Sequence, residues 1–328
     1  MLRRTLLAAA PGLALAPALA RPPAARAQAA WPARTVRFIC PFAAGGGTDT
    51  VSRLICEQLS RRLGQQFVVD NKGGAGGNIG TAELARAAPD GYTLGLISVA
   101  SHTLNPMLYG KLPYDPDRDI VGVSRLAILS NLLGVTPSLP VSSVAELVAL
   151  CRREPGKYSF ASSGPGTSLH LSGELFKTMA GVDIVHVPYK GAGPAYNDLM
   201  AGVVQMMFAN MPSMLPQVRG GKIKGLGVTS AARSQAAPDI PAIAETIPGY
   251  VATSWYGLGA PAGTPEPILA TLEAAVAQAL AAPEIVKRWA DDLGLDMPLP
   301  GRAGFDKFLA EDRRLWAPAV KASGVRLD

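Results

Sequence analysis

Four loops rich in glycine and hydroxyl side chains each lie between an apolar run and a helical pattern. They cover residues 45–49, 73–80, 162–168 and 188–193. Glycine lets the backbone approach a ligand closely, and N–H groups at the start of a helix carry partial positive charge. Hydrogen bonds from such donors to an anion are strong because the acceptor is charged. We therefore expect these loops to hold an anion such as a carboxylate without a fixed cation.

Three hydroxyl side chains are the candidate donors to one carboxylate: Thr48, Ser163 and Thr167. Thr48 or Asp49 can serve as the N-cap of the helix that follows the first loop. We expect Asp49 to cap the helix, and the alternative is that it shapes the loop or contacts the ligand. Lys190 can either close over the ligand or extend into solvent, because its long side chain has both options.

The fingerprints of nucleotide sites are incomplete in both glycine loops. The pattern G-x-G-x-x-G fails because Thr50 or Ile79 stands at the last glycine position, and G-x-x-x-x-G-K-[ST] is absent. The loop at 73–80 therefore either packs a helix tightly onto a sheet or forms a wall of the pocket. No nucleotide cofactor is expected.

Ser168 and His170 lie close enough in sequence to suggest a hydrolase, but the pattern does not support one. The G-x-S-x-G elbow requires a glycine where His170 stands. On a helix, residues two apart face different directions, and the loops hold no carboxylate pair for acid–base chemistry. We expect no catalytic residue. His170 then packs at a helix start or lines the pocket, His102 lines the cleft, and His186 is structural.

The cysteines and histidines do not form a metal pattern. Cys40, Cys56 and Cys151 are an odd set without C-x-x-C spacing, and no histidine falls at ligand spacing from them. We expect three buried thiols, with one disulfide as the alternative in an oxidising compartment. No metal is expected.

The N-terminus has the features of a cleaved export signal. Arg3 and Arg4 precede an apolar stretch at residues 6–20, and Ala27-Gln28-Ala29 fits the small-x-small cleavage rule. Residues 1–29 are thus predicted to be a signal peptide, by the general or the twin-arginine route. The leader's four arginines account for four of the six net positive charges. The remaining charge gives no reason to expect a nucleic-acid or membrane-surface partner.

The rest of the chain repeats an apolar strand, a loop and a helix, which predicts βαβ units and a mainly parallel sheet. Residues 121–135 and 252–260 are expected to carry the chain between two lobes. This gives an α/β clamshell with residues 30–125 and 253–328 in lobe 1 and residues 126–252 in lobe 2. The C-terminal helical patterns, 267–281 and 305–320, are expected to pack on lobe 1.

Several long motifs stand in a fixed order along this framework. They are Pro41-Phe42-Ala43-Ala44-Gly45-Gly46-Gly47-Thr48-Asp49, Gly74-Ala75-Gly76-Gly77-Asn78-Ile79-Gly80, Pro89-Asp90-Gly91-Tyr92-Thr93-Leu94, Asn105-Pro106, Leu112-Pro113-Tyr114-Asp115, Ala161-Ser162-Ser163-Gly164, Gly166-Thr167-Ser168 and His186-Val187-Pro188-Tyr189-Lys190-Gly191. Together they closely resemble the tripartite tricarboxylate transporter substrate-binding family, also called Bug proteins. The resemblance runs from about Pro32 to the C-terminus.

The resemblance implies a periplasmic receptor with the type II periplasmic-binding-protein fold, whose lobes hold a ligand carboxylate partly through bridging waters. The expected partner is a set of transporter membrane subunits. The alternatives are a sensory module that signals the liganded state and, more remotely, an α/β enzyme. We expect a monomer. The predicted ligand-binding residues are Phe42, Ala44, Gly46, Gly47, Thr48, Asp49, His102, Ser163, Gly164, Gly166, Thr167, His170, Lys190, Gly191 and Ala209.

One departure from the family pattern bears on the ligand. Many members look like F-D-N where this chain has Phe208-Ala209-Asn210. A cleft aspartate could pair with a ligand ammonium group, and an alanine cannot. Because an unpaired buried charge is costly, we expect a ligand without an amine, such as an aliphatic or aromatic mono- or dicarboxylate.

Overall fold

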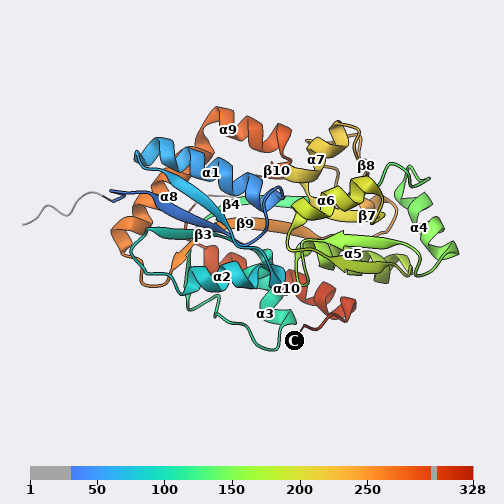
Figure 1. Cartoon of the computed structure of the whole chain (residues 1–328), viewed down its shortest axis with the longest axis horizontal. Coiled ribbons are helices and arrows are strands. Elements are labelled where there is room, and N and C mark those ends of the chain that lie inside the picture. The colour runs from blue at the N-terminus through green and yellow to red at the C-terminus, as the bar shows by residue number, and fades with distance from the viewer. Residues whose placement is uncertain (1–30, 297–300, 328) are drawn as a thin grey trace, which may run out of the picture. The chain divides into compact units, whose positions relative to one another are not determined.

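A computed structural model describes residues 31–296 and 301–327, and Figure 1 traces the chain. Contacts between residues divide the chain into Met1–Trp31 and Pro32–Asp328. The second unit holds the helices and strands described below. The signal peptide expected at residues 1–29 lies outside the described residues.

The described residues form one mixed sheet with the strand order β2-β1-β3-β9-β4-β7-β5-β6, and β8 and β10 also pair with β4. In its first part, β1 (Val36–Cys40) lies between β2 (Phe67–Asn71) and β3 (Thr93–Ser98), all parallel. Helix α1 (Gly47–Leu63) connects β1 to β2, and α2 (Asn78–Ala85) connects β2 to β3. These strand–loop–helix units confirm the sequence prediction for this part of the chain.

The second part of the sheet repeats the arrangement. Its parallel strands are β6 (Val185–Pro188), β5 (Ser159–Ser162) and β7 (Met206–Asn210), with α5 (Ser168–Ala180) and α6 (Ala192–Ala201) as crossovers. Three elements here were not predicted from the sequence: α4 (Val144–Arg153), α7 (Met211–Arg219) and β8 (Lys224–Val228). Helix α7 begins at Met211, directly after β7 ends at Asn210.

Both segments expected to connect the lobes are strands. β4 (Ile120–Val135) pairs with β9 (Thr253–Pro261) up to Ser130, and from Asn131 onward it pairs with β7, joined one residue later by β8. Each of these pairings is antiparallel, as is that of β9 with β3. The expectation of a mainly parallel sheet is therefore wrong. Parallel neighbours need a crossover connection, and β4 and β9 instead carry the chain between the two parallel parts.

The C-terminal elements are α8 (Glu266–Ala281), α9 (Pro283–Lys287), a π-helical turn (Arg288–Asp292), β10 (Leu295–Asp296) and α10 (Phe305–Ser323). Helix α8 contacts α1 and β4, whereas α10 contacts both α5 and the π-helical segment Ala100–Leu104. In Figure 1, α1 and α9 lie above the sheet and α2 and α10 below it. No single described helix is long and apolar enough to cross a membrane, although α8 and the helix after it, bent by 69°, pass that test as a pair.

Trp255 anchors α10 to the sheet. Its side chain is almost fully buried, and its ring meets those of Phe305 and Phe308 edge to face. Its indole N–H donates to the buried carboxylate of Asp312 at 2.8 Å. A large buried aromatic ring with a satisfied polar atom is a strong packing contact. Trp255 therefore fixes which face of β9 is covered by α10.

One buried threonine joins the places where the chain passes between the two parts of the sheet. Thr229 Oγ1 accepts the Asn131 N–H at 2.8 Å and donates to the Ala252 carbonyl at 2.6 Å. The backbone N–H of Thr229 also donates to the Asn131 carbonyl, and its carbonyl accepts the Ala252 N–H. Thr229 thus ties β4, at the residue where its pairing changes, to the residue that precedes β9.

Replacing Thr229 by valine keeps the side-chain shape but removes the hydroxyl. The Asn131 N–H and the Ala252 carbonyl would each lose a buried partner, and one unsatisfied group costs about 1–3 kcal/mol. We expect Thr229→Val to lower the free energy of unfolding, measured by urea denaturation, by at least that amount. Thr178→Val is the matched control, because this exposed hydroxyl bonds only its own helix and its loss should cost within ~0.5 kcal/mol. Equal losses in the two variants would contradict the role given to Thr229.

Candidate functional site

One small cavity lies where several loops and strand ends meet. Its lining residues are Phe42, Gly47, Thr48, Ser98, Val99, Ala100, Ser163, Thr167, Ser168, Leu169, Ala192, Asn210, Ser254 and Tyr256. The empty space among them, including the part open to solvent, is about 340 Å³. The part of this space that a water molecule can occupy is about 20 Å³, so a larger ligand needs the surrounding loops to separate. Among these lining residues of the described chain, none carries a formal charge.

Four helices begin at this cavity. The first residues or N-caps of α1, α5, α6 and α7 are among its lining residues, namely Gly47, Thr167, Ala192 and Asn210. No side chain caps α1, α6 or α7, whose N-caps are Gly46, Gly191 and Asn210. Each helix start presents backbone N–H groups and about half a positive charge. The cavity therefore attracts an anion although it contains no lysine or arginine.

Glycines allow the loops that border the cavity to touch through their backbones. The Ala43 N–H donates to the Lys190 carbonyl at 3.3 Å. A methyl group on Gly193 would lie 2.0 Å from the Ala44 carbonyl oxygen, and one on Gly191 would lie 2.8 Å from the Ala43 nitrogen. Only a residue without a Cβ fits at these distances. The first and fourth loops, which come from different parts of the sheet, thus close directly on each other.

Asp49 shapes the first loop from within the helix. Helix α1 begins at Gly47, so neither Thr48 nor Asp49 is its N-cap, contrary to the sequence expectation. The Asp49 carboxylate accepts the Gly45 N–H, Arg53 Nε and Asn71 Nδ2, each at 3.0 Å. Burial alone would raise the pKa of Asp49, but these hydrogen bonds and the Arg53 charge outweigh it and lower the pKa. Its negative charge is compensated by these partners, and Asp49 does not line the cavity.

The third loop is held by its own hydroxyls. Thr167 caps α5 by accepting the His170 N–H at 3.4 Å, and its own proton goes to the Gly164 carbonyl at 2.8 Å. Ser162 Oγ accepts the Gly164 N–H at 3.1 Å. Because the Thr167 proton is engaged, the groups that face a ligand here are the Ser163 side chain and the backbone at the start of α5. The expectation that Thr167 donates to the ligand therefore needs a rearrangement of this loop.

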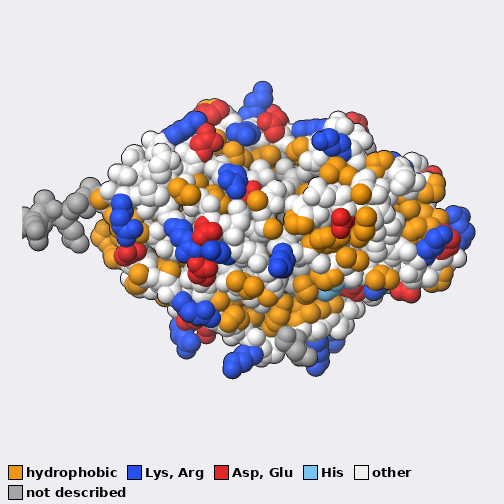
Figure 2. All heavy atoms as spheres, viewed as in Figure 1, with side chains coloured by type: hydrophobic (Ala, Val, Ile, Leu, Met, Phe, Trp, Pro, Cys, Tyr) orange, Lys and Arg blue, Asp and Glu red, His pale blue; other side chains and the backbone are white. Residues whose placement is uncertain are grey.

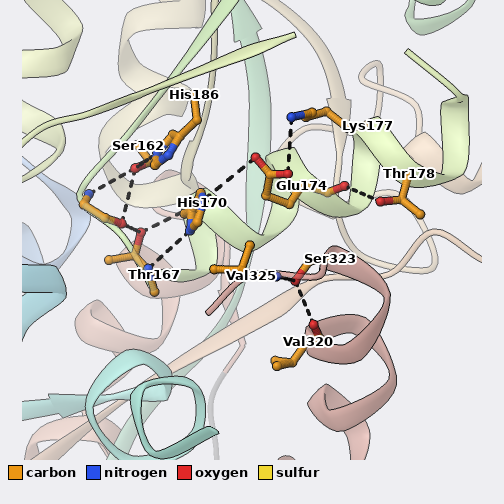
Figure 3. Close-up of polar contacts among 12 residues, drawn as sticks. Ser162, Thr167, His170, Glu174, Lys177, Thr178, His186, Val320, Ser323 and Val325 are labelled. Atoms are coloured by element: carbon orange, nitrogen blue, oxygen red, sulfur yellow. Dashed lines mark hydrogen bonds and ion pairs between the residues drawn. The ribbon is translucent and has the colours of Figure 1, made fainter. Parts of the chain in front are cut away.

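Two histidines stack behind the third loop (Figure 3). The rings of His170 and His186 lie 3.9 Å apart and nearly parallel, with Ser162 Oγ 2.7 Å from His186 Nε2. His170 Nδ1 accepts the Gly166 N–H at 3.2 Å, and its Nε2 is 3.8 Å from a carboxylate oxygen of Glu174. Both rings therefore brace the loop through neutral hydrogen bonds.

Burial keeps both imidazoles uncharged at neutral pH. It lowers the pKa of His170 to about 3 and that of His186 to about 4, and the nearby Lys177 charge acts in the same direction on both. A second charge in a stacked pair would be strongly unfavourable. Neither ring is among the lining residues, so they support the loop from behind.

Of the fifteen residues predicted for the site, five line the cavity: Phe42, Gly47, Thr48, Ser163 and Thr167. Ala44 and Gly46 lie in the first loop, and Lys190 and Gly191 lie in the fourth. Gly164 and Gly166 lie in the third loop. His102 is buried in the π-helical segment, with Nδ1 2.9 Å from Ser101 Oγ and its ring edge-on to Trp255. It does not line this cavity.

Ala209 is fully buried in β7 within an apolar cluster, and the next residue, Asn210, lines the cavity instead. This follows from the alternation of side chains along a strand. Sequence reasoning also missed Ser98, Ser254 and Tyr256, which line the cavity from β3 and β9. The available signal was the period-two spacing of Ser254 and Tyr256 around Trp255, in a segment that was interpreted as a connection.

Comparison with known proteins identifies the family. The model of the family described as "Tripartite tricarboxylate transporter family receptor" matches residues 51–325. The chain belongs to this receptor family. It is 37% identical to protein BugT of Bordetella pertussis over 300 residues, which cover 90% of this chain and 91% of BugT. It is 39% identical over 287 residues to a protein from the tcbD-tcbE intergenic region of Pseudomonas sp. strain P51, covering 87% of this chain and 84% of that protein.

Solved structures of other receptors are also similar. R. palustris Rpa4515 with adipate has a TM-score of 0.87 and 38% identity, over 90% of this chain and 99% of that one. The periplasmic binding protein BugD has a TM-score of 0.86 and 33% identity, over 90% and 99%. MatC from Rhodopseudomonas palustris with bound malate has a TM-score of 0.83 and 35% identity, over 88% and 100%. The receptor therefore has the two-lobed α/β fold of periplasmic solute-binding proteins, with β4 and β9 as its two crossover connections.

The stacked histidines predict how the receptor's stability depends on pH. Their folded pKa values, about 3 and about 4, lie below the unfolded value of about 6.5. The unfolded chain therefore binds more protons below that pH, so stability is complete above about pH 6.5 and is lost as the pH falls toward 4. Each histidine contributes a slope of up to ~1.4 kcal/mol per pH unit.

The test is urea denaturation between pH 5 and pH 7.5, where most carboxylates stay ionised. We expect His186→Gln to show a shallower loss of stability than the wild type. His102, whose pKa burial lowers to about 3, titrates equally in both proteins and serves as the common background. Identical slopes would contradict the assignment of this pH dependence to the histidine pair.

Proposed function

We propose that this receptor is exported, captures a small organic carboxylate between its two lobes and delivers it to the membrane subunits of a tripartite tricarboxylate transporter. The observation that carries the proposal is the meeting of four helix starts at one uncharged cavity. Backbone N–H groups at helix starts bind anions without a cation. A carboxylate is the anion that the relatives with adipate and malate suggest.

We assign residues 30–125 with 253–328 to lobe 1 and residues 126–252 to lobe 2. Support comes from β4, whose partner changes from β9 to β7 between Ser130 and Asn131. The Thr229 hydrogen bonds join both crossings. In this assignment the contact of Ala43 with Lys190 closes the cleft between the lobes.

Export to the periplasm is proposed from the N-terminal sequence and from the name of BugD, a periplasmic binding protein. On the face shown in Figure 2, lysine and arginine side chains alternate with acidic ones and do not gather in one basic patch. This face therefore offers no basic surface of the kind that a nucleic acid needs.

The ligand is proposed to lack an amine. No acidic side chain is among the residues that line the cavity. Asp49 is engaged by Gly45, Arg53 and Asn71 and is not among the lining residues, so it is not placed to pair with an ammonium group in the cavity. A buried ammonium without a partner is costly. The absence of acidic residues from the cavity lining supports an amine-free ligand more directly than the alanine at position 209 does, because Ala209 faces the core.

Matched acids test the ligand class by titration calorimetry. We expect succinate to bind more tightly than aspartate, and glutarate more tightly than glutamate, because each pair differs only by the amine. A difference of at least tenfold, ~1.4 kcal/mol, is expected in each pair. Tighter binding of the amino acid in both pairs would contradict the proposal of an amine-free ligand.

Closure through the glycine loops can be tested separately. The methyl group in Gly193→Ala would lie 2.0 Å from the Ala44 carbonyl oxygen, so the two loops would have to separate. Helix α6 itself should still form, because alanine is compatible with a helix. We expect the affinity for the tightest acid to fall at least tenfold, with an unchanged circular dichroism spectrum. Gly110→Ala is the control, since its methyl group meets open space. Wild-type affinity in Gly193→Ala would refute closure at this contact.

A further inference from the structure

Three buried hydroxyl groups at the cavity have no hydrogen-bond partner within the described part of the chain: Ser98 Oγ, Ser254 Oγ and Tyr256 Oη. Their residues are 2–3% exposed, and all three line the cavity. Buried polar groups are nearly always paired, and each exception calls for an explanation. By contrast, the buried hydroxyl of Tyr250, which lies away from the cavity, donates to the Ser172 carbonyl.

The strand register places these three side chains on one face of the sheet. Ser98 on β3 is the direct partner of Tyr256 on β9, and Ser254 lies two residues before Tyr256. Residues two apart in a strand point to the same side. Trp255 between them points to the other side, where Phe305, Phe308 and Asp312 hold it. The contact that anchors α10 thus also fixes the orientation of Ser254 and Tyr256.

We infer that Ser98, Ser254 and Tyr256 form a specificity-determining hydroxyl wall that binds a second oxygen group of the ligand, while the helix starts hold its first carboxylate. The inference rests on the proposed function, because both groups would occupy the same cavity. A ligand with only one polar end would lay its hydrocarbon tail against three unpaired hydroxyls. A dicarboxylate would satisfy both sides at once.

The chemistry of the hydroxyl wall favours an oxygen acceptor. Burial raises the pKa of Tyr256 well above its usual value, so the phenol keeps its proton and can donate. Its oxygen would lie 3.2 Å from a methyl group on Gly47, at the start of α1. The hydroxyl wall therefore borders the region where a helix start already favours negative charge. Four helix starts at about half a charge each can offset about two carboxylates.

The test compares acids that differ only at their second end: adipate with hexanoate and succinate with butyrate. Titration calorimetry of the full mature chain gives the ratio of the two affinities in each pair. We expect the wild type to prefer the diacid, and Tyr256→Phe to reduce that preference at least tenfold by weakening diacid binding alone. Ser254→Ala, which removes a smaller group, should change the ratio in the same direction. Tyr250→Phe is the matched control and should leave the ratio unchanged, because its hydroxyl lies away from the cavity.

The outcomes separate this inference from the proposed function. If the wild type and Tyr256→Phe show the same ratio of affinities, the hydroxyl wall does not bind the second oxygen group. The proposed function as a carboxylate receptor would be unaffected by that result. If Tyr256→Phe is poorly folded by circular dichroism, the Ser254→Ala ratio decides the question. If the wild type binds none of the acids, both the proposed function and this inference are overturned.

Discussion

The meeting of four helix starts at one cavity is the feature on which the anion site proposed for this receptor depends. Four helices from both parts of the sheet begin at one cavity, and their backbone N–H groups supply positive potential without a charged side chain. Placing these backbone donors around an anion costs no side-chain conformational entropy. They must, however, be brought close together, which only loops without bulky residues allow. The contacts of Gly191 and Gly193 with Ala43 and Ala44 satisfy that condition.

The titratable groups around the cavity leave no uncompensated charge beside it. The negative charge of Asp49 is compensated by hydrogen bonds from Gly45, Arg53 and Asn71, and the stacked histidines remain neutral because burial disfavours their protonated forms. Neither group competes with a carboxylate ligand for the helix starts. The same loops are therefore held by their own hydrogen bonds and are electrically suited to an anion.

The sheet couples this site to the framework of the molecule. β4 belongs to both parts of the sheet, and Thr229 joins Asn131, where the pairing of β4 changes, to Ala252, the residue before β9. β9 then presents Trp255 to α10 and two hydroxyls to the cavity. Since α10 contacts elements of both parts of the sheet, a shift between these parts would be transmitted to α10 and to the cavity wall together.

The sequence by itself determined the local elements and the chemistry of the loops. The glycine runs before α1 and α6, the hydroxyls before α5 and the apolar strands before each loop were recognised because they depend on neighbours in the chain. The family followed from the same motifs. Limits of helices were correct within a few residues, as for α8, which was expected over residues 267–281 and spans Glu266–Ala281.

Only the tertiary structure decided which side chains meet. The antiparallel course of β4 and β9 and the placement of Ser98 opposite Tyr256 follow from the register between distant strands. The stacking of His170 on His186 follows from the packing of α5 against β6. A shift of one residue in that register would turn Ala209 toward the cavity and Asn210 away from it. Register is set by packing of the whole sheet, of which Trp255 against α10 is one part. Sequence periodicity gives the two faces of a strand but cannot tell which face meets the ligand.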